Sequence, residues 1–407
     1  MKKVQEIDVN GKVVLVRFDY NVPIKDGVIL DDNKIKSSLE TLRYLINNNA
    51  KVVILSHLGK VKNEGDKVKN SLEVVCNRLK ELMNHEIYFS KEIFSSSLVE
   101  RVKMLNSGDV LMLQNTRYLD VPNGLESKCD AQLSAFWANM CDIYINDAFA
   151  SSHRKHASTY GVANMAIKMG KEVGIGISMQ KEIESLEHLV LNPNHPFTVI
   201  MGGAKMDDKM DLMSSLLPKC DYLLCGGGIA NTCLKTLNFS IGDSIHSEND
   251  EVVKKVKELL INYKEKIMLP VDVIVGSTYD KNYVSLKKVN EVVADDRIYD
   301  IGPLTLERYE KALASSKTVF LNGTVGYYED YRFANGTKEL LGYLAKSSSV
   351  VVVGGGDASS SVHNLGFDGK FTYISTGGGA TLDYISKGSL VALEPMMGGN
   401  KIETLDL

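Results

Sequence analysis

Short, almost uninterrupted apolar runs recur along the whole chain and alternate with longer segments of helical periodicity. The runs are rich in Val, Ile and Leu and predict strands at 13–16, 52–55, 110–113, 143–145, 198–201, 222–225, 272–275, 318–321, 350–353 and 373–375. Between them, segments such as 35–46 carry apolar residues at 35, 39, 42, 45 and 46, the spacing of a helix with one buried face. Strands that alternate with helices predict an α/β fold with parallel sheets covered on both faces.

The length of the chain indicates two domains. A chain of 407 residues is too long for one compact core and suits two domains of roughly 200 residues each. Near the midpoint, the polar helical segment 177–187 runs into a turn-rich stop at 191–196, so we expect a helix that connects the domains. The predicted boundaries are 1–175 for the first domain, 176–192 for the connecting helix and 193–387 for the second domain. Residues 395–401 are expected to form a loose tail.

Composition narrows the class of protein. Apolar residues make up 44% of the chain and charged residues 24%, close to the globular average, and the net charge of -4 argues against a general nucleic-acid binder. No apolar stretch reaches 18 residues and no apolar run follows the charges at the N-terminus, so neither a membrane span nor a secretory signal is expected. The six cysteines show no CxxC pair, which is typical of reduced, structural thiols in a cytosolic protein; a metal site built from them is the alternative.

Five predicted strands of the second half end in glycine-rich turns. These turns contain Gly202-Gly203-Ala204-Lys205, Gly226-Gly227-Gly228, Gly323-Thr324-Val325-Gly326, Gly354-Gly355-Gly356 and Gly377-Gly378-Gly379. One such turn alone can simply be a tight turn. In a parallel sheet, however, all five share the carboxyl edge, where glycine amides and helix starts attract phosphate. None matches a Walker or dinucleotide-binding loop, so those two kinds of site are disfavoured.

Charged residues accompany these turns. Lys205 and Lys209 are four residues apart, and we expect both on one face at the start of a helix, directed toward the phosphate edge. Asp357 follows a glycine triplet and is expected either to cap the next helix or to hold the Mg²⁺ of a nucleotide. Glu329 lies near the same edge, where a carboxylate can accept hydrogen bonds from a ribose.

Polar and cationic residues in the first half stand at or just beyond strand ends or at the first helix start. They are Asp19, Asn21, Lys34, His57, Lys60, Asn115, Arg117, Asp147, His153, Arg154 and His156. Each alone can be a solvated surface residue, but together they predict a site for a small, doubly anionic substrate. A metal pair formed by His153 and His156 is an alternative that lacks a nearby carboxylate array.

Eight strings of the sequence resemble, in order, the signature motifs of the phosphoglycerate kinase family. They lie at 16–23, 56–59, 146–149, 153–156, 202–205 with Lys209, 300–303, 354–357 and 375–379. The resemblance covers about 10–390. It implies two Rossmann-like, doubly wound lobes with parallel sheets, joined by an interdomain helix, with 388–407 packed on the first lobe. It also implies a cytoplasmic, monomeric enzyme that transfers a phosphoryl group reversibly between ATP and 3-phosphoglycerate with Mg²⁺.

The same resemblance implies roles for individual residues. Asp19 and Asn21 would grip the hydroxyl of the acid, and His57, Arg117 and Arg154 would hold its phosphate. Lys60 would also bind the acid. Lys34, Lys205 and Gly378 would act in the transfer itself, with Lys34 also touching the acid. Asp357 would hold the Mg²⁺. The nucleotide would be bound by Lys205, Lys209, Asn322, Glu329, Gly355, Gly356, Asp357 and Ala358.

Several positions depart from the family pattern, including Val61, Gln114 and Leu321. Lys34 and Lys60 stand where the family has Arg, so the charge is kept but the planar fork is lost. Thr324 replaces the Pro of a Trp-Asn-Gly-Pro loop, and Ala358 replaces a hydroxyl residue beside the phosphates. These changes leave two alternatives open: a related carboxylate kinase with a different acid substrate, or a nucleotide-binding protein with little catalysis.

Overall fold

The chain folds into two compact units. The computed structural model describes residues 1–190 and 193–398, and for 188–190 it describes the backbone only. One unit comprises Met1–Glu184 and the segment that starts at Ser389, and the other comprises Ser185–Gly388. The division falls inside helix α7 (Ile177–Val190). Leu191 and Asn192 of the expected connecting segment, and 399–401 of the expected tail, lie outside the described residues.

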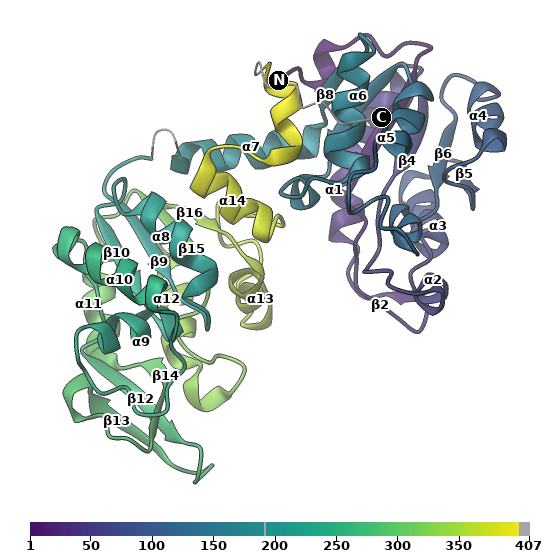
Figure 1. Cartoon of the computed structure of the whole chain (residues 1–407). Coiled ribbons are helices and arrows are strands. Elements are labelled where there is room, and N and C mark those ends of the chain that lie inside the picture. Colours follow the sequence, from purple (N-terminus) through teal and green to yellow (C-terminus); the bar gives the residue numbers. More distant parts are fainter. Residues whose placement is uncertain (191–192, 399–407) are drawn as a thin grey trace. The chain divides into compact units, whose positions relative to one another are not determined.

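The first unit is built on a six-stranded parallel sheet with the order β5-β6-β4-β1-β7-β8 (Figure 1). Its strands are β1 (Val13–Phe18), β4 (Lys51–Leu55), β5 (Ile87–Ser90), β6 (Val110–Leu113), β7 (Ile143–Asp147) and β8 (Glu172–Ile175). Its helices besides α7 are α1 (Asn33–Asn47), α2 (Glu64–Lys69), α3 (Glu73–Met83), α4 (Ser96–Lys103), α5 (Ala131–Asn139) and α6 (Val162–Lys168). A small hairpin joins β2 (Ile24–Lys25) to β3 (Val28–Ile29).

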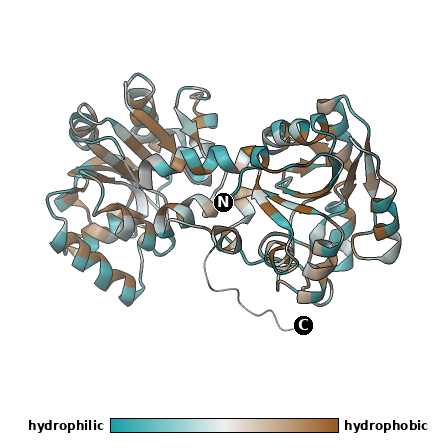
Figure 2. Cartoon of the chain, turned by 90° about the horizontal axis from the view of Figure 1, so that it is seen from above, coloured by the Kyte–Doolittle hydropathy of each residue, from teal (hydrophilic) through white to brown (hydrophobic). Residues whose placement is uncertain are grey.

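Both faces of this sheet are covered, as the apolar runs predict. In β1, Val14 and Val16 pack with residues of α1 and α3, while Leu15, which points the opposite way, packs with residues of α4, α5 and α6. Alternate side chains of a strand point to opposite faces, so an uninterrupted apolar run is what a strand between two helical layers requires. Figure 2 shows hydrophobic strands, coloured brown, inside each of the two units.

The chain returns to the first unit at its C-terminal end. A 3₁₀ segment, η8 (Val391–Met397), packs on α6 and on the π-helical turn η4 (Ala157–Gly161). Ala392 forms a buried cluster with Cys129 and Tyr160, and its amide donates a hydrogen bond to the carbonyl of Ser152 at 3.0 Å. Residues 395–397 of the expected loose tail therefore belong to an ordered, packed segment.

The second unit contains another six-stranded parallel sheet, with the order β11-β10-β9-β15-β16-β17. Its strands are β9 (Phe197–Met201), β10 (Tyr222–Cys225), β11 (Ile267–Met268), β15 (Thr318–Asn322), β16 (Val350–Val353) and β17 (Tyr373–Ile374). Its helices are α8 (Met210–Leu216), α9 (Gly227–Thr236), α10 (Asp250–Asn262), α11 (Pro303–Leu313), α12 (Asn335–Leu344), α13 (Gly356–Asn364) and α14 (Gly379–Lys387). The predicted α/β class with two doubly wound lobes and parallel sheets is confirmed.

One predicted strand belongs to a different sheet. β12 (Asp272–Ser277) lies between β13 (Val284–Lys288) and β14 (Asp296–Ile301) in a three-stranded antiparallel sheet, so the expectation that 272–275 adds to the parallel sheet is wrong. β12 is buried like a strand of the parallel sheet. Its apolar run therefore does not reveal whether the neighbouring strands are parallel or antiparallel to it.

The five glycine-rich turns do share one edge of the second sheet. They follow β9, β10, β15, β16 and β17, all parallel, and the turns after β9, β10 and β15 bond directly to one another. The amide of Gly203 donates to the carbonyl of Thr324 at 2.8 Å, and the amide of Gly228 donates to the carbonyl of Gly203 at 2.8 Å. A Cβ on Gly228 would stand 2.1 Å from the carbonyl oxygen of Ala204, so only glycine permits this approach.

Candidate functional site

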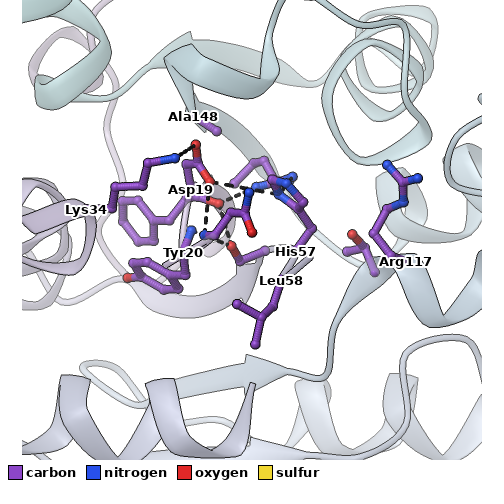
Figure 3. A network of polar contacts seen from close by, with 12 residues as sticks. Asp19, Tyr20, Lys34, His57, Leu58, Arg117 and Ala148 are labelled. Carbon is purple, nitrogen blue, oxygen red and sulfur yellow. Dashed lines mark hydrogen bonds and ion pairs between the residues drawn. The ribbon is translucent and has the colours of Figure 1, made fainter. Parts of the chain in front are cut away.

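Asp19 is the centre of a polar network in the first unit (Figure 3). It follows β1 directly, and its carboxylate accepts a hydrogen bond from Lys34 Nζ, in the first turn of α1, at 3.0 Å. His57 Nδ1, beyond the end of β4, lies 3.9 Å from the other carboxylate oxygen. Burial alone would raise the pKa of Asp19, but the neighbouring charges of Lys34, His57 and Arg17 outweigh it and lower the pKa. Asp19 is therefore an ionised carboxylate bound to a lysine.

His57 is a neutral hydrogen-bond donor in this network. Its Nδ1 lies 3.0 Å from Arg17 Nη2, and since a guanidinium can only donate, Nδ1 is the acceptor and the proton sits on Nε2. Burial and then the charge of Arg17 lower the pKa of His57 to about 3. Above that pH, His57 offers an N–H group rather than a positive charge.

Arg17 lies inside β1 and is completely buried. Its Nε donates to Ser158 Oγ at 2.9 Å, and that hydroxyl donates to the buried carboxylate of Glu126 at 2.5 Å. Burial is the main influence on both ions: it lowers the pKa of Arg17 and raises that of Glu126. Arg17 was not among the predicted site residues; an arginine within an apolar run is the signal that could have found it.

Three further predicted residues lie near this network. Arg117 follows β6 and forms an ion pair with Asp120. The pKa of His156 falls to about 4, mainly through burial and then through the positive charges of Arg117, Arg17 and Arg154. Arg154 is exposed and its Nε donates to His153 Nε2 at 3.0 Å. Arg117 and Arg154 thus both lie close enough to His156 to lower its pKa.

The other predicted residues of the first unit differ in position. Asn21 is exposed and its Oδ1 accepts from the amide of Gly59 at 2.8 Å, while Lys60 is exposed at the edge of the same turn. Asn115 and Asp147, in contrast, are interior. Asn115 donates to backbone carbonyls at 2.7 and 2.9 Å, and Asp147 accepts from Thr41 Oγ1 at 2.6 Å and from the amide of Met179 at 2.7 Å. Both hold local structure.

The second unit contains a pocket of about 490 Å³ beside the glycine-rich edge. It is lined by Gly203, Ala204, Gly227, Gly228, Asn231, Ile245, Arg297, Ile298, Tyr299, Thr324, Gly326, Tyr327, Glu329 and Asp357. Glu329 and Asp357 are therefore part of the pocket wall, together with residues of three glycine-rich turns. Its volume falls in the range of sites that hold small organic ligands.

Lys209 and Asp357 lie close to Gly203, a residue of the pocket wall. A Cβ on Gly203 would be 3.1 Å from Lys209 Nζ and 3.9 Å from Asp357 Oδ2. Lys209 Nζ donates to the carbonyl of Gly202 at 2.5 Å, and burial lowers its pKa to about 8, against the opposing charge of Asp357. Asn322 is buried, and its Nδ2 donates to the carbonyl of Gly354 at 2.8 Å. Its Oδ1 has no hydrogen-bond partner among the residues that the structure describes.

Two details of the predicted helix starts are wrong. Lys205 precedes the short 3₁₀ turn η5 (Asp207–Lys209), and α8 begins only after Lys209, so the two lysines do not share a helix face. Lys205 is exposed and does not line the pocket. Asp357 does not cap α13; the cap position is Gly355, and Asp357 stands in the first turn with its carboxylate in the pocket.

The glycines at the end of the sheet adopt conformations that other residues avoid. Gly355 has φ +98°, and a Cβ there would lie 2.8 Å from Asn322 Nδ2. Gly378, at the start of α14, has φ +54° and ψ -119°. Gly356 begins α13, and Ala358, two residues further on, is buried. Both helices therefore direct free N-terminal amides at this edge.

Asp357 can hold a magnesium ion only if a bound ligand, such as the phosphates of a nucleotide, completes its coordination. Across the described residues, no group of three or more His, Cys, Asp or Glu side chains forms a ready metal site. Asp357 supplies one carboxylate. That is the usual protein share for Mg²⁺, which takes its other ligands from phosphates and water.

Two doubly wound parallel sheets, each with cationic groups at the carboxyl ends of its strands, place the chain in the class of α/β phosphotransferases. The sequence model of the family described as "Phosphoglycerate kinase" matches residues 4–387. The chain belongs to the phosphoglycerate kinase family. No helix in the described part of the chain is long and apolar enough to span a membrane.

Relatives and solved structures agree with this assignment. Phosphoglycerate kinase of Lactobacillus delbrueckii subsp. lactis is 41% identical over 386 residues, covering 94% of this chain and 95% of the relative. That of Lactobacillus gasseri is 42% identical over 387 residues, with the same shares covered. Among structures, phosphoglycerate kinase from Coxiella burnetii has a TM-score of 0.86 at 32% identity, covering 97% of this chain and 98% of that one. The enzyme from Pyrococcus horikoshii has a TM-score of 0.79 at 31% identity, covering 98% of both.

Proposed function

We propose that this chain transfers a phosphoryl group reversibly between ATP and 3-phosphoglycerate, giving ADP and 1,3-bisphosphoglycerate in glycolysis and gluconeogenesis. The observation that carries the proposal is the match to the phosphoglycerate kinase family along residues 4–387. The two sites described above support it, since one concentrates cations around an ionised carboxylate and the other combines glycine amides with Lys209 and Asp357.

The acid belongs to the first unit in this proposal. Asp19 and Asn21 accept hydrogen bonds from the hydroxyl of the acid, and His57, Lys60, Arg117 and Arg154 bind its phosphate. The neutral Nε2–H group of His57 suits this role, because it donates to a phosphate oxygen at any pH well above 3.

The nucleotide belongs to the second unit. Glu329 bonds the ribose, and Lys205, Lys209, Asn322, Gly355, Gly356 and Ala358 surround the phosphates. Asp357 holds Mg²⁺, which neutralises charge on the phosphate oxygens when bound. Gly378 supports transfer through the amides that open α14.

The chemistry needs no general base. The attacking carboxylate has a reference pKa near 3.5–4, so at neutral pH it is already ionised. Rate enhancement then comes from alignment and from cations around the transferring group, chiefly Lys34 and Lys205. A cytoplasmic location and a monomeric state stay predictions.

A coupled assay with 3-phosphoglycerate and MgATP tests the proposal. We expect turnover that depends on both substrates and on Mg²⁺. Turnover only with another acid, or nucleotide binding without turnover on any acid, would contradict it.

The role of Asp357 has a separate test. Asp357→Asn should lower kcat at a fixed Mg²⁺ concentration at least about tenfold and raise the Mg²⁺ concentration needed for half-maximal rate. The matched control is Asp368→Asn, an exposed carboxylate paired with His363 in the same unit, which should leave both quantities unchanged.

A further inference from the structure

The pocket of the second unit has an arginine in its wall that the proposed function does not use. Arg297 lies in β14, in the antiparallel sheet, and lines the pocket with Ile298 and Tyr299. The segment 242–245 runs alongside, since the amide of Ile298 donates to Ser244 Oγ at 2.8 Å and Gly242 forms a β-bridge with Arg297. Lys209 and Asp357 follow strands of the parallel sheet, whereas Arg297 belongs to the antiparallel sheet. If the phosphates of a nucleotide lie at Lys209 and Asp357, Arg297 is left for another part of that nucleotide.

Arg297 is held in place by aromatic rings. Its Cζ atom lies 5.5 Å from the ring centre of Tyr299, and Tyr299 stacks on Phe333 with ring centres 4.5 Å apart and planes at 23°. Gly276 makes room for this column, because a Cβ there would lie 3.0 Å from the Tyr299 ring and 3.1 Å from the Phe333 ring. A guanidinium fixed in this way loses little rotamer entropy when it binds a ligand.

The guanidinium has donors to spare. No hydrogen bond or ion pair joins the Arg297 side chain to any group within 1–190 or 193–398, and the side chain is half-buried. A half-buried guanidinium with five N–H groups and no acceptor is costly unless a ligand or water supplies one. Water or a ligand that enters the pocket can supply these acceptors.

Purine bases differ in what they offer such a fork. The edge of a 6-oxopurine (guanine or hypoxanthine) presents two acceptors, O6 and N7, and an arginine can bind both at once. Adenine presents N7 but carries an N6 amino group, a donor, where the second acceptor is needed. We propose that Arg297 binds O6 and N7 of the base and so raises the preference of this pocket for guanine and hypoxanthine nucleotides relative to adenine nucleotides. This inference rests on the proposed function, because it requires the phosphates to lie at Lys209 and Asp357.

The test compares three nucleotides and four proteins. kcat/KM is measured with MgGTP, MgITP and MgATP at saturating 3-phosphoglycerate for the wild type, Arg297→Met, Arg297→Lys and Arg308→Met, the last an exposed arginine of α11 as control. In Arg297→Met, the GTP/ATP and ITP/ATP ratios should both fall about 5- to 150-fold, the range for one bidentate base contact. Arg297→Lys should lose most of the same discrimination because the fork is absent, and Arg308→Met should lose none.

Three results would overturn the proposal: equal effects on all three nucleotides, no effect, or an effect on GTP alone, because ITP carries the same O6 and N7 acceptors as GTP. Calorimetric binding of MgGDP and MgADP to the same proteins keeps the test independent of turnover. If no nucleotide supports transfer to 3-phosphoglycerate, the proposed function fails. A lower GDP/ADP affinity ratio in Arg297→Met would still support base selection by Arg297, and an unchanged ratio would refute it.

Discussion

At the scale of single residues, Lys34 is the position where this chain departs most consequentially from the pattern of its family. Its ammonium group bonds to Asp19 at 3.0 Å and remains partly exposed. An ammonium is a compact point charge, whereas a guanidinium can bond two oxygens of a transferring phosphoryl group at once. Lys34 therefore keeps the positive charge of the family's arginine but cannot bond two phosphoryl oxygens at once.

Lys34→Arg should therefore raise kcat with 3-phosphoglycerate, by several-fold to about tenfold, because it adds a second aligned donor. Steady-state kinetics measure the change. Lys36→Arg is the control: it lies two residues on in α1, is exposed and pairs with Asp32, so its kcat should equal that of the wild type. An unchanged or lower kcat for Lys34→Arg would show that Lys34 does not face the transferring group.

At the scale of elements, the apolar pattern predicted the buried strands well and the edge strands poorly. All ten predicted runs are strands, and those at 110–113, 222–225 and 350–353 have the predicted limits. Seven strands were missed: β2, β3, β5, β8, β11, β13 and β14. Most of them carry charged or exposed residues, as in the alternating burial of β13, and polar side chains interrupt an apolar run without preventing strand pairing.

The same limit explains which site residues could be predicted. Residues directly after the strands of a parallel sheet, such as Asp19, His57 and Asp357, were found because strand ends gather at one edge. Arg17 was missed because its side chain points into the interior from within a strand. Arg297 was missed because β14 meets the pocket only through the tertiary fold.

Gly378 gives a prediction about the start of α14. Gly378→Ala should destabilise the second unit by about 1–3 kcal/mol, since an L-residue is strained at φ +54° and ψ -119°, and should lower kcat as the helix amides shift. Chemical denaturation and kinetics measure the two effects. Gly342→Ala is the matched control, because that glycine lies within α12 with 3.8 Å to its nearest neighbour, so alanine should be neutral or stabilising. Equal stability of both variants would contradict the prediction.

Asp300 gives a prediction about pH. Its carboxylate accepts from the amides of Gly336 at 2.7 Å and Ile301 at 2.9 Å, which ties β14 to the start of α12, and burial raises its pKa to about 7. Between pH 4 and 7 the folded state holds a proton that the unfolded state releases. The contribution of Asp300 to stability therefore falls as pH rises, by at most about 1.4 kcal/mol per pH unit.

Denaturant unfolding of the wild type and Asp300→Asn at pH 4.5, 5.5, 6.5 and 7.5 measures this slope. Their difference in unfolding free energy should shrink steadily with rising pH, because Asn does not titrate. Asp295→Asn, an exposed carboxylate nearby, should show no such trend. A difference that is constant across the series would mean that Asp300 is ionised throughout.

At the scale of the whole molecule, the chain consists of two units, and the proposed acid and nucleotide sites lie in different units. A ligand that binds only the folded state stabilises the unit that holds it, by about 2.7 kcal/mol at a hundred times its Kd. Each substrate should therefore protect the amides of its own unit from hydrogen exchange.

Amide hydrogen exchange measures this protection in each unit separately. 3-Phosphoglycerate should slow amide exchange mainly within 1–184, and MgADP mainly within 185–388. Lys209→Met should weaken the MgADP effect and leave the 3-phosphoglycerate effect intact, whereas Lys254→Met, an exposed lysine of α10, should change neither. Protection of the first unit by MgADP alone would reverse the proposed assignment of ligands.

The return of η8 to the first unit sets the order of events while the protein is being made. Cys129 and Tyr160 emerge early, but the residue that covers them, Ala392, follows the whole of Ser185–Gly388. At roughly 5–20 residues per second, a ribosome needs about 10–40 seconds to synthesise the intervening stretch. For that interval the nascent first unit presents an uncovered apolar patch, so its completion is timed by translation of the second unit rather than by its own folding rate.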